Sequence, residues 1–236
     1  MHKQVFFLIV LLGLSIEAKL QIIHAEYTVN HGISANLNNG SVQQLAQLNY
    51  IGHLYKKGER YISFDQPLFL EQYSTGGIEY DAGNGVSGIH TLCMDSLQAL
   101  ILVDYDSGVF RQKLDISAHD GPPKLLLYYF QPGGQIWQLD SAVRQIDGLT
   151  CQRATSRNEK TGKLYWTAWI ATDIPFRAGP AGIRDVPGLV VEATSHVVNK
   201  TYKLQSYRTE PAVAPAALWP AYFNFPFEVR NQRPGG

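Results

Sequence analysis

The two cysteines carry the most reactive side chains of this sequence. Cys93 and Cys151 are its only thiols, and both lie after the apolar N-terminus described below. In an oxidising compartment an even pair of cysteines predicts a disulfide, whose closed loop would stabilise the fold by roughly 4 kcal/mol. Two separately buried thiols are the alternative, because a sequence does not show which cysteines pair. Either thiol could also act as a nucleophile if the fold placed a histidine beside it.

The seven histidines are scattered along the chain without the spacing of metal ligands. One local cluster, His90-Thr91-Leu92-Cys93-Met94, offers soft ligands to copper or zinc. A metal site needs three or four ligands, and no second cluster in the sequence supplies the others. We therefore predict no metal and no cofactor.

Other catalytic patterns are incomplete. The glycine-rich stretch from Gly76 to Gly88 lacks the lysine of a phosphate-binding loop and is predicted to be a flexible surface loop. Its segment Gly85-Val86-Ser87-Gly88 misses the last glycine of a serine-hydrolase motif. Asp173 and Glu192 could form a pair of carboxylates for acid–base chemistry, but nothing in the sequence places them face to face.

The elements that must position these residues are predicted to be strands. Thirteen Tyr, ten Phe and four Trp favour sheet, and no apolar period of 3.6 residues persists after the N-terminus. Short strands recur between turn residues, which is typical of an antiparallel domain. We predict a mainly β domain over residues 26–210, with one curved antiparallel sheet (half-barrel or sandwich-like) and little helix after the signal peptide.

The N-terminus resembles a secretory signal. Lys3 precedes the apolar run Val5–Leu14, which is too short to span a bilayer core of about 30 Å. We predict a signal peptide over residues 1–25, cleaved between 15 and 26, and hence an exported protein that is periplasmic, outer-membrane-associated or secreted. Residues 211–236 are predicted to form an irregular proline-rich tail.

The charge balance and the later hydropathy exclude two classes of partner. Twenty acidic and twenty basic residues cancel, so no overall field attracts nucleic acid. No later segment approaches 18 consecutive apolar residues, so no transmembrane span is predicted. The identity of a partner stays open.

The strand LYWTAWIA, residues 164–171, carries large apolar side chains on both faces. A half-exposed strand would alternate with charges, so this one is predicted to lie centrally in the sheet. Tyr165, Trp166 and Trp169 are the candidates to line a concavity, and only one of the two tryptophans can do so because neighbouring residues point to opposite faces. A packed core is the alternative for the same aromatic residues.

Two pairs of turn residues follow that strand, Gly179-Pro180 and Pro187-Gly188. Proline fixes φ, and an adjacent glycine can adopt conformations closed to other residues. A phosphate-binding loop would lead into a helix, but the strand-like run that begins at Leu189 follows here. We predict a structural corner.

Around this corner the chain resembles the GLPGLI family, exported proteins of the Bacteroidetes named for a Gly-Leu-Pro-Gly-Leu-Ile motif. The resemblance covers residues 148–154 (GLTCQRA), 165–174 (YWTAWIATDI), 179–180 and 186–192 (VPGLVVE), in the family's order. Asp185-Val186 replaces the motif's first Gly-Leu, and Val190 replaces its final Ile. The resemblance implies a secreted or periplasmic, envelope-associated protein, and it supplies no catalytic residue or cofactor.

Two functions follow from these observations. The first is a noncatalytic envelope protein that binds an apolar or peptidic ligand, or a partner protein, on a concave face of the sheet. The alternative is a hydrolase or thiol-dependent enzyme that uses Cys151 or Cys93. A nucleophile, a base and an orienting group that meet in the fold would favour the enzyme.

Overall fold

The computed structural model of the chain describes residues 22–115, 124–158, 161–210 and 218–231. Nearly all of its regular structure is strand, which confirms the predicted mainly β class. Two short 3₁₀ turns, η1 (Pro180–Gly182) and η2 (Ala221–Asn224), interrupt it. The strands are β1 (Ile22–Asn36), β2 (Val42–Lys57), β3 (Arg60–Pro67), β4 (Gly77–Gly83), β5 (Val86–Thr91), β6 (Gln98–Asp104), β7 (Val109–Lys113), β8 (Leu125–Tyr129), β9 (Trp137–Ile146), β10 (Leu149–Arg157), β11 (Leu164–Ala171), β12 (Leu189–Ser195), β13 (Lys200–Glu210) and β14 (Glu228–Val229).

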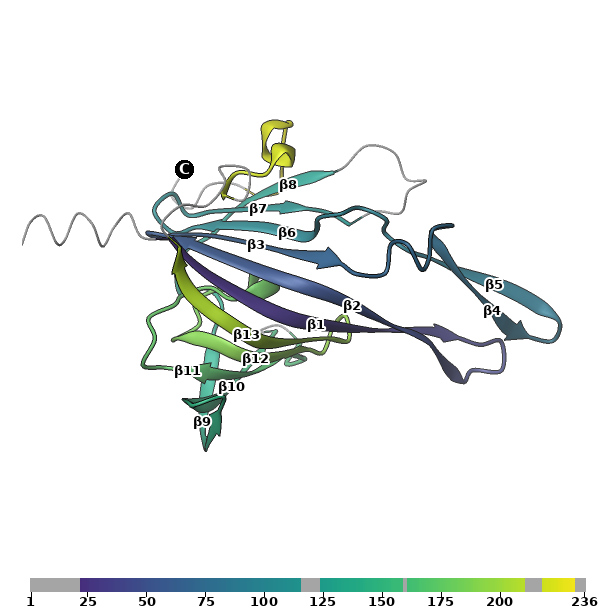
Figure 1. The fold of residues 1–236 in the computed structure, drawn as a ribbon, viewed down its shortest axis with the longest axis horizontal. Coiled ribbons are helices and arrows are strands. Elements are labelled where there is room, and N and C mark those ends of the chain that lie inside the picture. The colour runs from purple at the N-terminus through teal and green to yellow at the C-terminus, as the bar shows by residue number, and fades with distance from the viewer. Residues whose placement is uncertain (1–21, 116–123, 159–160, 211–217, 232–236) are drawn as a thin grey trace, which may run out of the picture.

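Twelve of these strands form one open sheet in the order β14-β8-β7-β6-β3-β2-β1-β13-β12-β11-β10-β9. Neighbouring strands are antiparallel except β14 and β8, which are parallel. The long strands β1 and β2 lie near the middle of the sheet, and the separate β4–β5 hairpin projects at one end of the molecule (Figure 1).

The sheet curves around a single large core. The loop of residues 172–188, between β11 and β12, carries η1 onto β3 and β6, which are several strands away in the sheet order. One buried cluster accordingly joins Val29 of β1, Val103 of β6, Ile170 of β11 and Ile183 of the loop. We call the sheet face that carries this cluster the inner face and the opposite one the outer face.

Tyrosine hydroxyls tie the 172–188 loop to the other half of the sheet. The Tyr105 hydroxyl accepts the Asp185 N–H at 2.8 Å and donates to the Arg177 carbonyl at 2.6 Å. The Tyr61 hydroxyl accepts the Arg177 N–H, and the Tyr27 hydroxyl donates to the Val190 carbonyl at 2.9 Å. The segment predicted as a corner is therefore an internal bridge across the curved sheet.

Asp185 has an uncommon backbone conformation within the 172–188 loop. Its φ of 54° lies in the left-handed region, which glycine favours and aspartate adopts more readily than most residues. Its carboxylate accepts the backbone N–H groups of Gly133 and Gln135 at 2.8 and 3.1 Å. The aspartate side chain thus links the 172–188 loop to the segment before β9.

The prediction of a flexible loop at residues 76–88 is wrong, because this stretch forms the β4–β5 hairpin. Asn84 and Gly85 form its two-residue turn with φ values of 57° and 74°. Positive φ at both positions is what a type I′ turn requires, and Asn-Gly is its strongest sequence signal. The glycine count of the stretch concealed that signal.

Ordered elements lie on both sides of the predicted domain bounds, residues 26 and 210. Strand β1 begins at Ile22, inside the predicted signal peptide, so cleavage after Ala25 would remove four paired residues whereas cleavage after Ala18 would leave β1 intact. Residues 1–21, 211–217 and 232–236 lie outside the described residues. Within the predicted irregular tail, residues 218–231 pack on the outer face, where Phe223 is buried against Ile62, Leu100 and Leu102.

We predict that Gly188→Ala lowers the free energy of unfolding by more than about 2 kcal/mol, because two costs add. The φ of Gly188 is 150°, and a Cβ would lie 2.5 Å from the Ala171 carbonyl oxygen. Gly58→Ala is the matched control, since its φ is 60° but nothing lies within 4 Å of a Cβ there. It should cost only about 1 kcal/mol. Equal losses in chemical denaturation would contradict a structural role for the corner.

Candidate functional site

A small cavity of about 160 Å³ opens on the inner face between β1, β2 and the segment that follows β5. Its lining combines apolar side chains with a few polar and charged ones, which is the usual composition of a ligand pocket. The lining residues are His31, Ile33, Leu48, Tyr50, Phe69, His90, Thr91, Leu92, Cys93, Gln98, Asp115 and Lys200.

A buried ion pair lies at the base of this cavity. The Lys200 Nζ donates to the Asp65 Oδ2 at 2.9 Å, and the Tyr202 hydroxyl donates to the same oxygen at 3.1 Å. The Asp65 side chain is 2 % exposed and the Lys200 side chain 9 %. The ammonium also lies 4.5 Å from the centre of the Tyr50 ring, which attracts it through the π face. These charges satisfy one another, so they hold the cavity wall in place.

Burial still raises the pKa of Asp65 above its usual range, while the Lys200 charge and the two hydrogen bonds oppose that rise. Removing a carboxylate from water disfavours its charged form, and a buried pair offsets this cost only in part. The Lys200 ammonium is therefore what permits an ionised carboxylate at this position.

Among the described residues, His31 carries the one buried side-chain nitrogen or oxygen without a hydrogen-bond partner. Its Nδ1 is buried and has no hydrogen-bond partner among the described residues. Burial, with the nearby Lys200 and His90, lowers the pKa of His31 to about 4, although a hydrogen bond with the Val198 backbone opposes the shift. The ring is thus neutral at pH 7 and has a single N–H. If that N–H serves the Val198 backbone through Nε2, the Nδ1 in the cavity wall is an acceptor.

The two cysteines do not form the predicted disulfide, because both are free. Cys93 lines the cavity and interacts with the charges of Asp115, Lys113 and Asp95, whereas Cys151 is buried on β10 near Arg144 and Glu192. The pairing prediction is therefore corrected. These different surroundings show that the fold places the two thiols apart.

Neither thiol has the surroundings of a nucleophile. Burial raises the pKa of Cys93 and of Cys151, so both favour the protonated form. Cys93 shares the cavity with His31 and His90, but no hydrogen bond joins its thiol to an imidazole within the described ranges. The Cys151 thiol faces the Leu149 carbonyl at 3.5 Å.

The aromatic candidates of β11 lie elsewhere. Tyr165 and Trp166 line a more open groove of about 350 Å³ with Arg157 and Arg184. Trp169 lies under the Arg144 guanidinium, 4.0 Å from the ring centre, and Arg144 also pairs with Glu192. A ligand contact for Tyr165, Trp166 or Trp169 stays a prediction.

Sequence reasoning missed Asp65, Lys200, Tyr202 and His31 because they come from three distant strands, β1, β3 and β13. A weak signal was present in β13, where Lys200 alternates with Tyr202 and Leu204 on the inner face. A lysine at a core-facing position needs a buried partner. The sequence does not show that Asp65, two strands beyond β1 in the sheet, is that partner.

Comparisons with known proteins identify no family. No family model matches the chain and no curated protein matches it, so the resemblance to the GLPGLI family stays a prediction. Two crystal forms of PNGF-II align over 90 % and 89 % of this chain with 11 % identity and TM-scores of 0.49. The chain spans 31 % of the PNGF-II length.

Two smaller proteins align with lower TM-scores. A DUF1329 family protein from Desulfovibrio piger has a TM-score of 0.27 and 9 % identity, over 86 % of this chain and 92 % of its own. A domain from Vibrio parahaemolyticus, described as an outer membrane lipoprotein-sorting protein domain, has a TM-score of 0.27 and 7 % identity, over 90 % and 97 %. Because these scores are low, function must be argued from the site itself.

We predict that the unreduced protein releases two titratable thiols on denaturation. Before denaturation, at pH 8, an aromatic disulfide reagent should modify half-buried Cys93 more slowly than free cysteine and leave buried Cys151 unmodified, since a raised pKa lowers the thiolate fraction. Cys151→Ser provides the control that assigns each signal. No titratable thiol in denaturant would contradict the free cysteines.

We also predict that Lys200→Met lowers the free energy of unfolding by about 3–5 kcal/mol at pH 8, because it leaves the Asp65 carboxylate buried and unpaired. Asp65 then binds a proton more tightly in the folded than in the unfolded state. The loss should therefore shrink as pH falls toward 5. Lys203→Met, on the same strand but exposed, serves as the control and should have little effect at either pH. A loss that is equal at pH 5 and pH 8 would exclude Asp65 as its cause.

Proposed function

We propose that this chain is an exported, noncatalytic binding protein that holds an amphipathic ligand in the inner-face cavity. The observation that carries the proposal is the buried Nδ1 of His31, a residue of the cavity lining, which lacks a hydrogen-bond partner among the described residues. Buried polar atoms in native proteins are almost always hydrogen-bonded. A ligand that offers a hydroxyl or amide N–H supplies the missing partner.

The dimensions and walls of the cavity define the rest of the ligand. A volume of about 160 Å³ is smaller than most drug-sized pockets, and it is close to that of an apolar cavity that holds benzene. Ile33, Leu48, Phe69 and Leu92 supply the apolar wall. The cavity therefore suits one aromatic or aliphatic group with a donor, such as a side chain of a peptide.

The charges and thiols support binding over catalysis. Lys200, Asp65 and Tyr202 are bonded to one another, so the two charges already have a structural role. The pKa of the Cys93 thiol is raised, so the enzyme alternative would need a further change on binding to ionise it.

Two sequence resemblances support export to the cell envelope. The N-terminus resembles a secretory signal, and the corner resembles that of envelope-associated proteins. Cleavage after Ala18 is compatible with the start of β1 at Ile22. None of the helices in the described ranges has the length and hydropathy to cross a bilayer.

Binding of p-cresol and toluene tests the proposed ligand chemistry. The two differ by one hydroxyl, which should donate to the His31 Nδ1. We expect saturation-transfer NMR titrations to show p-cresol binding roughly 2- to 10-fold more tightly, the value of one net hydrogen bond. In His31→Phe the preference should disappear while toluene still binds.

His196→Phe is the matched control, because His196 is exposed and bonds to Thr167 on another part of the sheet. It should leave the preference unchanged. Equal affinity of the wild-type protein for both probes, or a preference that survives in His31→Phe, would refute the proposed role of His31.

A further inference from the structure

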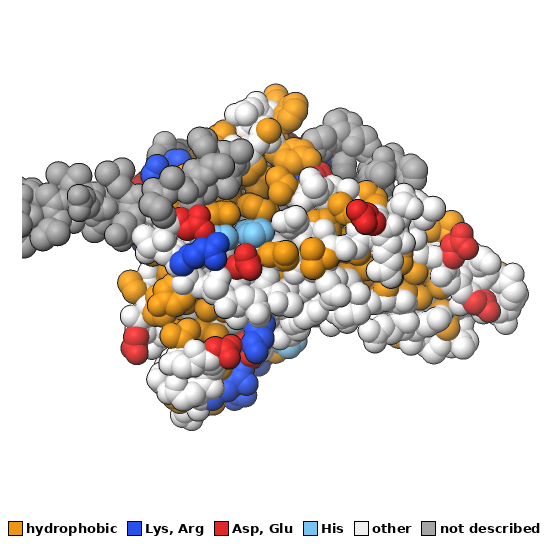
Figure 2. Space-filling model, in the orientation of Figure 1, with side chains coloured by type: hydrophobic (Ala, Val, Ile, Leu, Met, Phe, Trp, Pro, Cys, Tyr) orange, Lys and Arg blue, Asp and Glu red, His pale blue; other side chains and the backbone are white. Residues whose placement is uncertain are grey.

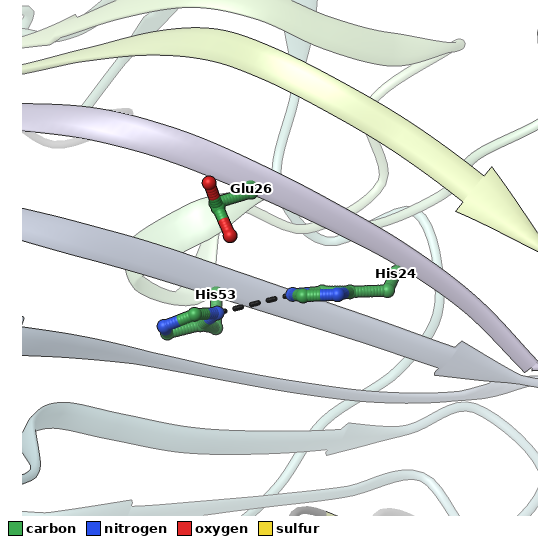
Figure 3. Close-up of side chains that lie close together, drawn as sticks. All are labelled: His24, Glu26 and His53. Atoms are coloured by element: carbon green, nitrogen blue, oxygen red, sulfur yellow. Dashed lines mark hydrogen bonds between the residues drawn. The ribbon is translucent and has the colours of Figure 1, made fainter. Parts of the chain in front are cut away.

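A second polar cluster lies on the outer face, where β1 and β2 run side by side. Figure 3 shows His24 and Glu26 from β1 together with His53 from β2. Their ligand-type atoms all lie within 4.8 Å of one another. Histidine, acidic and basic side chains also stand next to one another among hydrophobic ones on the face seen in Figure 2.

The strand geometry brings these three residues together. His24 and Glu26 are two positions apart on β1, so they point to the same face. Glu26 pairs directly with His53 across the antiparallel ladder, and His24 pairs with Tyr55. Ala25 and Tyr27 point to the inner face, where they are buried in the core.

Neighbouring side chains fix both imidazole rings. The His24 ring stacks on Tyr55 with centroids 4.3 Å apart, and the His53 ring lies 4.9 Å from that of Phe64. The His24 Nδ1 bonds to the Glu210 carboxylate at 3.0 Å, and His53 has a hydrogen bond with the Gln66 side chain. Each ring thus has one nitrogen held by an outer partner, an arrangement typical of histidines that bind metal.

The remaining nitrogens face one another. The His24 Nε2 and the His53 Nδ1 lie 3.0 Å apart. In the absence of a metal ion, one of the two nitrogens must therefore carry a proton and donate it in a hydrogen bond to the other. Burial and the neighbouring His24 lower the pKa of His53, which favours its neutral form. The Glu26 carboxylate has no hydrogen bond or ion pair with any other described residue, although it stands beside both rings.

We propose that His24, Glu26 and His53 bind one divalent transition-metal cation of the zinc class. Two imidazole nitrogens and one carboxylate are a known donor set for zinc and for ferrous iron, and they leave a further coordination position open. The cation replaces the proton between the two nitrogens and gives Glu26 a partner. In a tetrahedral zinc site the ligand atoms lie roughly 3.4 Å apart, so Glu26 needs only a small side-chain movement.

This site is independent of the inner-face cavity, because the sheet itself separates them. His24 and Glu26 occupy the outer face of β1, whereas His31 and Ile33 lie on the inner face of the same strand. A failure of the ligand proposal would therefore not affect the metal proposal, and the reverse also holds.

Zinc titration of tag-free, chelator-treated protein tests the site. We expect one equivalent of Zn²⁺ to bind in competition with a chromogenic chelator, and Co²⁺ to give visible absorption bands of a tetrahedral complex. Glu26→Gln and His53→Ala should each weaken zinc binding by more than 10-fold. Glu210→Ala, which removes the outer partner of the His24 Nδ1, should weaken it by about 10- to 100-fold.

Circular dichroism separates loss of the ligand set from loss of the fold. Glu26→Gln keeps the shape of a half-buried side chain with no described partner, so its spectrum and melting temperature without metal should match the wild type. His196→Ala, which removes an exposed histidine far from the cluster in the sequence, should bind zinc normally. No stoichiometric zinc binding by the wild-type protein, or unchanged affinity in both Glu26→Gln and His53→Ala, would overturn the proposal.

Discussion

An open, strongly curved sheet has a concave apolar face that something must cover, and this constraint shapes the rest of the molecule. The 172–188 loop provides the cover, with Phe176, Ile183 and Val186 buried beneath β3 and β6. Such a loop brings backbone polar groups into the core, where each needs a hydrogen-bond partner. The hydroxyls of Tyr61 and Tyr105 supply such partners, and the Tyr27 hydroxyl bonds to Val190 at the start of β12. The tyrosines thus act as polar links between two halves of a sheet that does not close.

The 172–188 loop covers one end of the inner face, and polar side chains gather at the other end. It reaches the part of the sheet near the start of β1 and the end of β2, where Lys56 donates to the Pro175 carbonyl. Further along β1, the core-facing positions pair His31 with Lys200 instead of with apolar residues. A polar cluster at that point costs desolvation energy that aliphatic side chains would avoid. This desolvation cost arises beside the cavity. Natural proteins accept such a loss of stability at functional sites, so the position of the cluster is consistent with ligand binding.

Strand patterns predicted the sheet well because each strand is specified by its own residues. Hairpins such as β2–β3 and β6–β7 follow from alternation and turn residues alone. The sites were not predictable in this way, since Asp65 meets Lys200 only through the curvature and pairing of distant strands. Alternation on β1 could still have placed His24 and Glu26 on one face, but the predicted signal peptide included residue 24.

One bulge in β13 lets this strand contribute side chains to both polar clusters, one on each face of the sheet. Tyr27 pairs with Leu204 but Glu26 pairs with Ser206, so Gln205 has no counterpart on β1. An extra residue reverses the alternation of the strand that contains it. Lys200 and Tyr202 therefore reach the inner face and bind Asp65, whereas Arg208 and Glu210, also at even positions, reach the outer face beside His24. If Gln205 were paired with Glu26 in a regular ladder, Glu210 would point to the inner face and His24 would lose the carboxylate that orients its ring. Because Gln205 is left out of the ladder, residues at even positions of β13 contribute to the polar clusters on both faces of the sheet.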